Sequence, residues 1–269
     1  MQSSHATFPG LSHLQTACAC QDFCLTGVKS TDTSTWAYAI VSDGCSTAGR
    51  TDIGAALLTQ LAHSWLQTQH SPPDPQLLHH ELHRHLLEQL RMLQSQLALT
   101  PRDLMATLLI LIATPHRLYG LAWGDGAVLV QTSSSQTLFC LNAPLNTPSY
   151  LAYQLTSTPP PPLASWESTA LGGQDDTLRH TTFHTSTGAV AFHIEPLDPS
   201  LPLWHWAGVS SDGLPPSLIS KDIQMPQQWT GPGQFVPREL SYAWRTLWKK
   251  QPSKHPSDDC ALAVIRQQI

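Results

Sequence analysis

The chain has 269 residues, of which 41% are hydrophobic and only 12% charged, and its formal net charge is −5. It is long enough to bury a sizeable core, whereas general nucleic-acid binding requires a basic face that an acidic chain lacks. No apolar run is long enough to cross a membrane, and no basic segment followed by an apolar one opens the chain. We therefore expect no nucleic-acid partner, no membrane, no signal peptide and a cytoplasmic location.

The first half of the chain predicts strands and two long helices. Residues 1–12 are expected to be irregular. One helix is predicted to begin at an N-cap, Thr51, with Asp52 in its first turn. A second helix is predicted over Gln76–Leu97, where leucines recur every three or four residues. The apolar runs predict strands over Asp22–Ser30, Trp36–Val41 and Ala106–Ala113.

The second half is richer in predicted strands. Arg117–Trp123 and Ala127–Thr132 are expected to pair as a hairpin around Gly124-Asp125-Gly126. Residues 142–176 are expected to be irregular, and so long a connection often marks a functional flap. A last helix is predicted over Pro237–Trp248. Further strands are predicted over Thr137–Leu141, Gly188–Ile194, Leu203–Ser210 and Cys260–Arg266.

The order of these elements indicates the fold class. Strands come in groups separated by helices, without the regular strand-helix alternation of a doubly wound sheet, and this favours a layered α+β architecture. No internal repeat and no convincing boundary interrupts the chain, so we expect a single domain over residues 1–269.

Acidic residues recur where the predicted buried strands end. Asp43-Gly44, Asp125-Gly126 and Asp212-Gly213 each follow an apolar run, and Asp258-Asp259 precedes the last one. Any one Asp-Gly pair also fits a tight turn. As a set, however, carboxylates at the ends of separate strands can converge. A cluster of oxygen ligands suits Mg²⁺ or Mn²⁺ rather than zinc or copper.

Two other groups of residues could bind a metal. His79, His80, His83 and His85 punctuate the second long helix, where they also fit a solvated face beside the leucine stripe. Cys18, Cys20 and Cys24, with His13, lack the Cys-x-x-Cys spacing of a zinc knuckle. We expect these thiols to be reduced and to pack in a strand.

Six segments, in this order and rough spacing, resemble the type-2C, metal-dependent (PPM-type) protein serine/threonine phosphatases. They are Cys20-Gln-Asp22, Val41-Ser-Asp43-Gly44, Ala106-Thr-Leu-Leu, Trp123-Gly-Asp125-Gly126, Ser211-Asp212-Gly213-Leu214 and Asp258-Asp259-Cys-Ala-Leu. The segment Asp43–Ala55 resembles a bacterial subgroup of that family. The resemblance implies a four-layer α-β-β-α sandwich of two antiparallel sheets flanked by helices.

The resemblance also implies an activity. Members of the family are metal-dependent phosphoric monoester hydrolases that cleave phosphoserine and phosphothreonine by attack of a metal-bridging water. The implied cofactors are two Mn²⁺ or Mg²⁺ ions, with a third in some members. The implied partner is a phosphoprotein substrate, with a serine/threonine kinase acting in opposition.

Individual roles follow from the same resemblance. Asp43 would bridge the two ions, and the Gly44 carbonyl would ligate one of them. Asp212 and Asp258 would hold the second ion. Asp22 would lie beside the pair as a ligand or through a bound water. The implied catalytic residues are thus Asp43, Asp22, Asp212 and Asp258, and the implied metal ligands are Asp22, Asp43, Gly44, Asp125, Asp212 and Asp258, with Asp125 at the third ion and Asp259 in support.

One feature departs from the family. Many members carry an arginine that binds the phosphate shortly before the first acidic motif, where this chain has Gln15-Thr-Ala-Cys-Ala. His13 and Arg50 are the candidate replacements. Two other functions stay open from the sequence: a catalytically weak or inactive phosphatase fold that binds or senses a partner, and a hydrolase of small phosphomonoesters.

Overall fold

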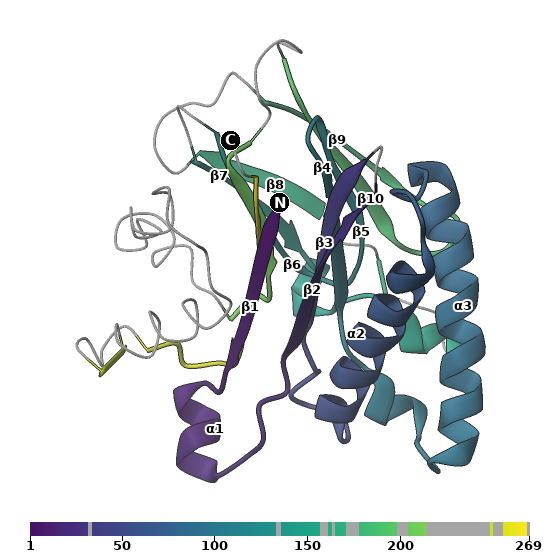
Figure 1. The fold of residues 1–269 in the computed structure, drawn as a ribbon. Coiled ribbons are helices and arrows are strands. Elements are labelled where there is room, and N and C mark those ends of the chain that lie inside the picture. Colours follow the sequence, from purple (N-terminus) through teal and green to yellow (C-terminus); the bar gives the residue numbers. More distant parts are fainter. Residues whose placement is uncertain are drawn as a thin grey trace.

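Apolar strands build two antiparallel sheets of six strands each in the computed structural model of the protein (Figure 1). The structure describes residues 1–31, 34–132, 136–156, 161–162, 165–170, 178–197, 204–213, 248–249 and 255–267. The first sheet has the order β1-β12-β11-β6-β7-β8, formed by Gln2–Phe8, Cys260–Arg266, Trp206–Ser210, Gly126–Gln131, Gln136–Asn142 and Ser165–Ala170. The second has the order β2-β3-β4-β5-β10-β9, formed by Phe23–Ser30, Thr35–Ser42, Leu108–Thr114, Arg117–Trp123, Val190–Pro196 and Leu178–His184.

Strand β3 contributes to two apolar cores at once. Successive side chains of a strand point to opposite faces. The larger residues of β3, Trp36, Tyr38 and Ile40, pack in the core beneath the helices. The smaller ones, Ala37, Ala39 and Val41, pack in the core between the two sheets. Because both faces are buried, the strand is apolar throughout rather than alternating.

Two long helices cover the outer face of the second sheet (Figure 1). They are α2, Thr51–Thr68, and α3, Pro75–Gln96. Helix α3 begins where Asp74 accepts a hydrogen bond from the Gln76 N–H at 2.8 Å, with Pro75 in its first turn. As predicted, a leucine stripe faces the core, and its buried members are Leu78, Leu82, Leu86 and Leu90.

The predicted N-cap of α2 was wrong. Thr51 is already helical, and its hydroxyl donates to the Cys45 carbonyl at 3.1 Å instead of capping the helix. The remaining helices are short: α1, Leu11–Thr16, and the 3-10 turns η1, Pro101–Leu104, η2, Pro144–Asn146, and η3, Leu151–Leu155. In the described part of the chain, no helix combines the length and the apolar character needed to span a membrane.

The two sheets pack face to face with α2 and α3 outside, which confirms the α+β fold with two antiparallel sheets. The predicted helix over Pro237–Trp248 lies outside the described residues except for its end. There Trp248 is helical and packs edge-on against Phe8 of β1, with ring centroids 4.6 Å apart.

Two further predictions of secondary structure were wrong. Residues 1–12 are not irregular, because β1 pairs along its whole length with β12. Residues 142–176 include the strand β8, and β9 follows it. Both are edge strands of their sheets, and β9 has largely exposed side chains, so neither carries the apolar run by which a buried strand is recognised.

The predicted hairpin at Gly124-Asp125-Gly126 is also wrong, and its correction matters for the site. β5 belongs to the second sheet and β6 to the first, so these residues cross between the sheets. Gly124 has φ +99° and Gly126 has φ +139°, values that favour glycine. A Cβ on Gly126 would lie 2.9 Å from the Ser210 carbonyl oxygen. The two glycines thus allow Asp125 to sit between the sheets.

Candidate functional site

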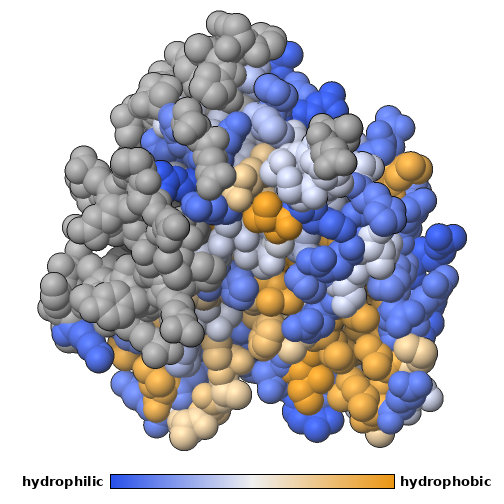
Figure 2. Space-filling model, viewed as in Figure 1, coloured by the Kyte–Doolittle hydropathy of each residue, from blue (hydrophilic) through white to orange (hydrophobic). Residues whose placement is uncertain are grey.

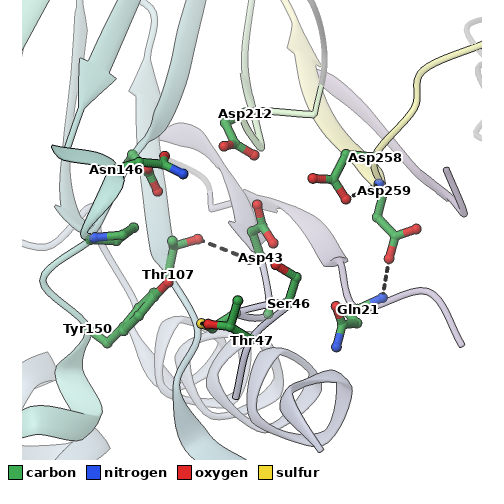
Figure 3. Close-up of a pocket in the computed structure, with 14 residues that line it drawn as sticks. Gln21, Asp43, Ser46, Thr47, Thr107, Asn146, Tyr150, Asp212, Asp258 and Asp259 are labelled. Carbon is green, nitrogen blue, oxygen red and sulfur yellow. Dashed lines mark hydrogen bonds between the residues drawn. The ribbon is translucent and has the colours of Figure 1, made fainter. Parts of the chain in front are cut away.

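Four carboxylates from distant parts of the chain, together with Asp259 next to one of them, line one pocket of about 160 Å³ (Figure 3). Asp43 follows β3, Asp125 lies between β5 and β6, Asp212 follows β11, and Asp258 precedes β12. Strand pairing explains their convergence, since Ser210 pairs with both Ala127 and Leu262. These strands therefore begin or end at the same end of the sandwich. Figure 3 shows the carboxylates of Asp43, Asp212 and Asp258 facing a common space.

Asp43 and Gly44 are held by the residues just before β4. The Asp43 N–H donates to Thr107 Oγ1 at 3.0 Å, and the Thr107 N–H donates to the Asp43 carbonyl at 2.8 Å. Gly44 forms an isolated bridge with Ala106. A Cβ on Gly44 would lie 2.8 Å from the Thr51 carbonyl oxygen, so a side chain does not fit there. The main chain at Asp43-Gly44 is thus fixed from the neighbouring strand.

Asp22 lies buried beside Asp43, with a relative exposure of 2%. The Ser211 hydroxyl donates to Asp22 Oδ2 at 2.6 Å and itself accepts from the Ala261 N–H at 2.9 Å. The other oxygen, Asp22 Oδ1, has no hydrogen-bond donor among the described residues. A buried carboxylate oxygen without a donor is costly, so this atom indicates a missing positive or donating group.

Burial and like charge raise the pKa values of this cluster. Burial, only partly offset by the Ser211 hydrogen bond, raises the pKa of Asp22 to about 7. Burial, reinforced by the charges of Asp22 and Asp212, raises the pKa of Asp43 well above its usual range. Burial and the Asp212 charge raise the pKa of Asp125 to about 6. Gathering these charges is unfavourable unless protons or cations neutralise them.

The donor set fits hard divalent cations. All of the converging groups are oxygen donors, the kind that Mg²⁺ and Mn²⁺ prefer, and one buried oxygen, Asp22 Oδ1, has no partner in the described protein. Within the described residues, no three His, Cys, Asp or Glu side chains are already gathered as a metal-binding group.

The two candidate phosphate-binding cations do not line the pocket. His13 Nδ1, on α1, lies 2.8 Å from Asp259 Oδ2, an ion pair when the imidazole is protonated. The Arg50 side chain is 63% exposed, and its Nε lies 3.9 Å from Asp103 Oδ1. Each cation is thus placed beside a carboxylate outside the predicted metal-ligand set.

Asp259 ties the N-terminal segment to β12. Its Oδ1 accepts from the Gly10 N–H at 2.7 Å and its Oδ2 from the Gln21 N–H at 2.5 Å. Asp259 also lines the pocket, but these bonds engage both of its oxygens. Its main contribution is to hold the segment that leads into Asp22.

Several pocket residues were not predicted. Uncharged groups complete the described lining, and they are Gln21, Cys45, Ser46, Thr47, Thr107, Asn146, Pro148 and Tyr150. Among the residues that the structure describes, no Lys or Arg lines the pocket. Thr107 belongs to a segment that carried the resemblance, so that motif was its signal. Asn146, Pro148 and Tyr150 come from the connection after β7, which has no chemical pattern in the sequence.

The other candidate ligands form no metal site in the described part of the chain. His80 is exposed, whereas the other three helical histidines are half-buried, so the prediction of a solvated face was only partly right. His83 Nε2 lies 2.6 Å from Gln154 Oε1, and its ring stacks on Trp123. Cys18, Cys20 and Cys24 are free thiols with increasing burial.

Comparisons with known proteins identify the family and the fold. The family model of protein phosphatase 2C matches residues 9–176, more than half of the chain. A solved bacterial serine phosphatase is similar, with 12% identity, a TM-score of 0.57 and 100% of both chains covered.

Two further solved structures have a similar fold. Serine/threonine phosphatase Stp1 from Staphylococcus aureus has 12% identity and a TM-score of 0.57, covering 100% of this chain and 96% of its own. The serine/threonine phosphatase of S. agalactiae has 13% identity and a TM-score of 0.56, with 99% of both chains covered. At these identities the likeness concerns the fold. No curated protein sequence matches the chain.

Proposed function

Because the chain belongs to the protein phosphatase 2C family, we propose that it is a metal-dependent phosphatase that hydrolyses phosphoserine and phosphothreonine in proteins. One observation carries this proposal above the others. Asp43, Asp125, Asp212 and Asp258 line a single pocket, and Asp22 lies buried against Asp43 with one oxygen lacking a donor. A fold alone does not define an activity, but this convergence supplies the ligands that the activity needs.

We assign the ligand roles as follows. Asp43 and the Gly44 carbonyl would hold one cation, with Asp43 shared by a second. Asp212 and Asp258 would hold that second cation. Asp22 would lie beside the two cations, either as a ligand or by orienting a bound water. Asp125 would serve a third, weaker site. When bound there, Mn²⁺ or Mg²⁺ neutralises phosphoryl oxygens and makes water a better nucleophile.

The protein's own residues place the carboxylates in advance. Thr107 fixes the main chain of Asp43, and Ser211 fixes one oxygen of Asp22. Asp259 holds Gln21, and with it the approach to Asp22. These contacts keep the ligands ordered at the ends of strands, which matters because small errors of placement weaken catalysis strongly.

Among the described residues, substrate phosphate would meet uncharged donors in this pocket. Ser46, Thr47, Asn146 and Tyr150 are among the lining side chains that can donate to a phosphoryl oxygen. A phosphatase fold that binds a phosphoprotein with little or no turnover is the second candidate. A hydrolase of small phosphomonoesters is the third.

The deciding experiment compares three substrates with the purified protein: a phosphothreonine peptide, para-nitrophenyl phosphate and a nucleoside monophosphate. Each is assayed with Mn²⁺, with Mg²⁺ and with chelator. We expect metal-dependent turnover that favours the peptide. Peptide binding without turnover would select the binding protein, and preference for the nucleotide would select the small-molecule hydrolase. Turnover undiminished by chelator would contradict the metal-dependent mechanism.

The proposed substrate implies a partner enzyme. Phosphoserine and phosphothreonine in a protein must be made by a serine/threonine kinase, so we propose that this phosphatase opposes such a kinase. The test is to phosphorylate a protein with such a kinase and then add the phosphatase. Loss of phosphate only when metal is present would support this pairing.

A further inference from the structure

A second cavity of about 320 Å³ opens beside the carboxylate pocket. The two share three lining residues, Asp125, Asn146 and Asp212, so they are direct neighbours. The chemistry of the two cavities differs, because the walls of the second are mostly apolar. Its apolar wall consists of Ala127, Leu138, Leu141 and Ala143, beside the half-buried thiol of Cys140.

Two of the polar side chains around this second cavity are already engaged, and Asp125, Asn146 and Asp212 lie on the side that it shares with the carboxylate pocket. The Ser211 hydroxyl donates to Asp22, and the Asn142 amide donates to Glu167 Oε2 at 2.9 Å. A cavity holds water well only when it offers the water several polar partners, and an apolar cavity of about 150 Å³ can bind benzene. A cavity with these walls is therefore suited to an apolar group as large as the side chain of leucine or phenylalanine.

An exposed leucine stands next to the shared wall. Leu145 is 98% exposed and has φ +54°, and Asn146, which lines both cavities, has φ +53°. A leucine in the left-handed region is unfavourable by about 1 kcal/mol or more. The η2 turn thus displays a large apolar side chain to solvent, adjacent to a residue that lines both cavities.

We propose that the second cavity receives an apolar side chain of the substrate peptide, close in sequence to the phosphorylated residue, while Leu145 packs on the same segment. This inference rests on the proposed function and names the substrate class of that site. The shared lining residues place the apolar group beside the phosphate. The apolar wall also disfavours a charged side chain at that position of the peptide.

The test uses phosphothreonine peptides that differ at one position near the phosphate, which is Leu, Ser or Asp. Each of the three positions on either side is examined in turn with Mn²⁺. At one position at least, we expect kcat/KM for Leu to exceed that for Ser about tenfold or more, as hydrophobic pockets discriminate, with Asp poorest. Fluorescence anisotropy of the same peptides measures affinity without requiring turnover.

Two variants and one matched control locate the effect. Ala143→Phe fills the cavity, so the ratio of kcat/KM for Leu over Ser should fall toward one. Leu145→Asn removes the exposed side chain and suits the left-handed backbone, so it should weaken peptide binding without lowering the melting temperature. Leu97→Asn changes an exposed leucine directly after α3, outside both cavities, and should retain the native ratio.

The outcomes separate this inference from the proposed function. A protein that neither turns over para-nitrophenyl phosphate nor binds any phosphopeptide overturns both. Turnover without preference among the peptides, or a preference that Ala143→Phe leaves intact, overturns the inference alone. If the protein shows no preference among the peptides and the Ala143→Phe variant melts lower, the cavity would instead be filled by a side chain of the protein itself, and the inference would be overturned. If that variant fails to fold, the peptide affinity of Leu145→Asn decides.

Discussion

Asp43 is hydrogen-bonded through both of its main-chain groups to one residue, Thr107. The Asp43 N–H donates to Thr107 Oγ1 at 3.0 Å, and the Asp43 carbonyl accepts from the Thr107 N–H at 2.8 Å. Thr107 is 3% exposed and directly precedes β4. The central carboxylate of the pocket is therefore positioned by a side chain more than sixty residues away.

Replacing Thr107 by Val should destabilise the protein, because the hydroxyl that accepts from the Asp43 N–H is lost within a buried site. The expected loss in the free energy of unfolding is about 1–3 kcal/mol. Thr107→Ser keeps the acceptor and should retain most of the Mn²⁺ affinity that Thr107→Val loses. Denaturant melts and calorimetric titration with Mn²⁺ measure both. Equal metal affinity in the two variants would show that the hydroxyl does not position Asp43.

Asp43→Asn should separate a metal ligand from a turn residue. It keeps the size of the side chain and removes one of several crowded charges. We expect turnover with Mn²⁺ to fall by orders of magnitude and the metal-free melting temperature to be equal or higher. Added metal should stabilise the variant less than the native protein. A metal-free variant that melts markedly lower would make Asp43 a structural residue.

The metal-free protein should lose stability as the pH rises. Burial raises the pKa of Asp22 to about 7 and that of Asp125 to about 6, so both hold protons more tightly folded than unfolded. Such an acid stabilises the fold below its unfolded pKa, and this stabilisation disappears as the pH rises through its folded pKa. With chelator, the melting temperature should fall between about pH 5 and about pH 8.

Saturating Mg²⁺ should remove most of that fall, because cations then replace the protons. The Asp103 carboxyl changes stability with pH in the opposite direction, because hydrogen bonds from the Arg50 N–H and from Thr100 lower its pKa to about 2. Its contribution changes only below about pH 4, outside this window. If the stability of the chelator-treated protein rose over the same pH range, the raised pKa values of Asp22 and Asp125 would be contradicted.

Asp125→Ala tests the proposed third site. Asp125 is positioned by the crossing between the sheets, at the border of both cavities. The variant should turn over substrate more slowly while keeping two tight Mn²⁺ sites in calorimetry. Loss of those two sites would place Asp125 in the central pair. Asp125→Asn is the matched control for size, and it should resemble Asp125→Ala in turnover if charge is what matters.

Local chemistry in the sequence determined much of this protein. The apolar runs that become β3, β4 and β12 are buried on both faces, so their composition alone marks them as strands. Helix α3 carries a leucine stripe with an Asp-Pro start, and both signals are local. The ordered Asp motifs indicated the family, and the family model confirmed it. The single domain over residues 1–269 stays a prediction.

Only the tertiary structure decided how these pieces meet. Gly124-Asp125-Gly126 has the composition of a hairpin, but the pairing of β5 with β10 and β4, and of β6 with β11 and β7, makes it a crossing between sheets. β1, β8 and β9 lie at sheet edges, where one neighbour suffices and no apolar run is required. Long-range pairing, which the sequence does not encode locally, made these choices.

The same division holds for the site. Carboxylate motifs are visible in the sequence because their residue types carry the chemistry. The surroundings of His13 and Arg50 are not visible in the sequence, because His13 meets Asp259 and Arg50 meets Asp103 only in the folded chain. Asn146 comes from a connection with no motif, and it reaches both cavities because the strands on either side of that connection are fixed by pairing. Residue types thus determined what chemistry is possible, and packing decided which residues share a wall.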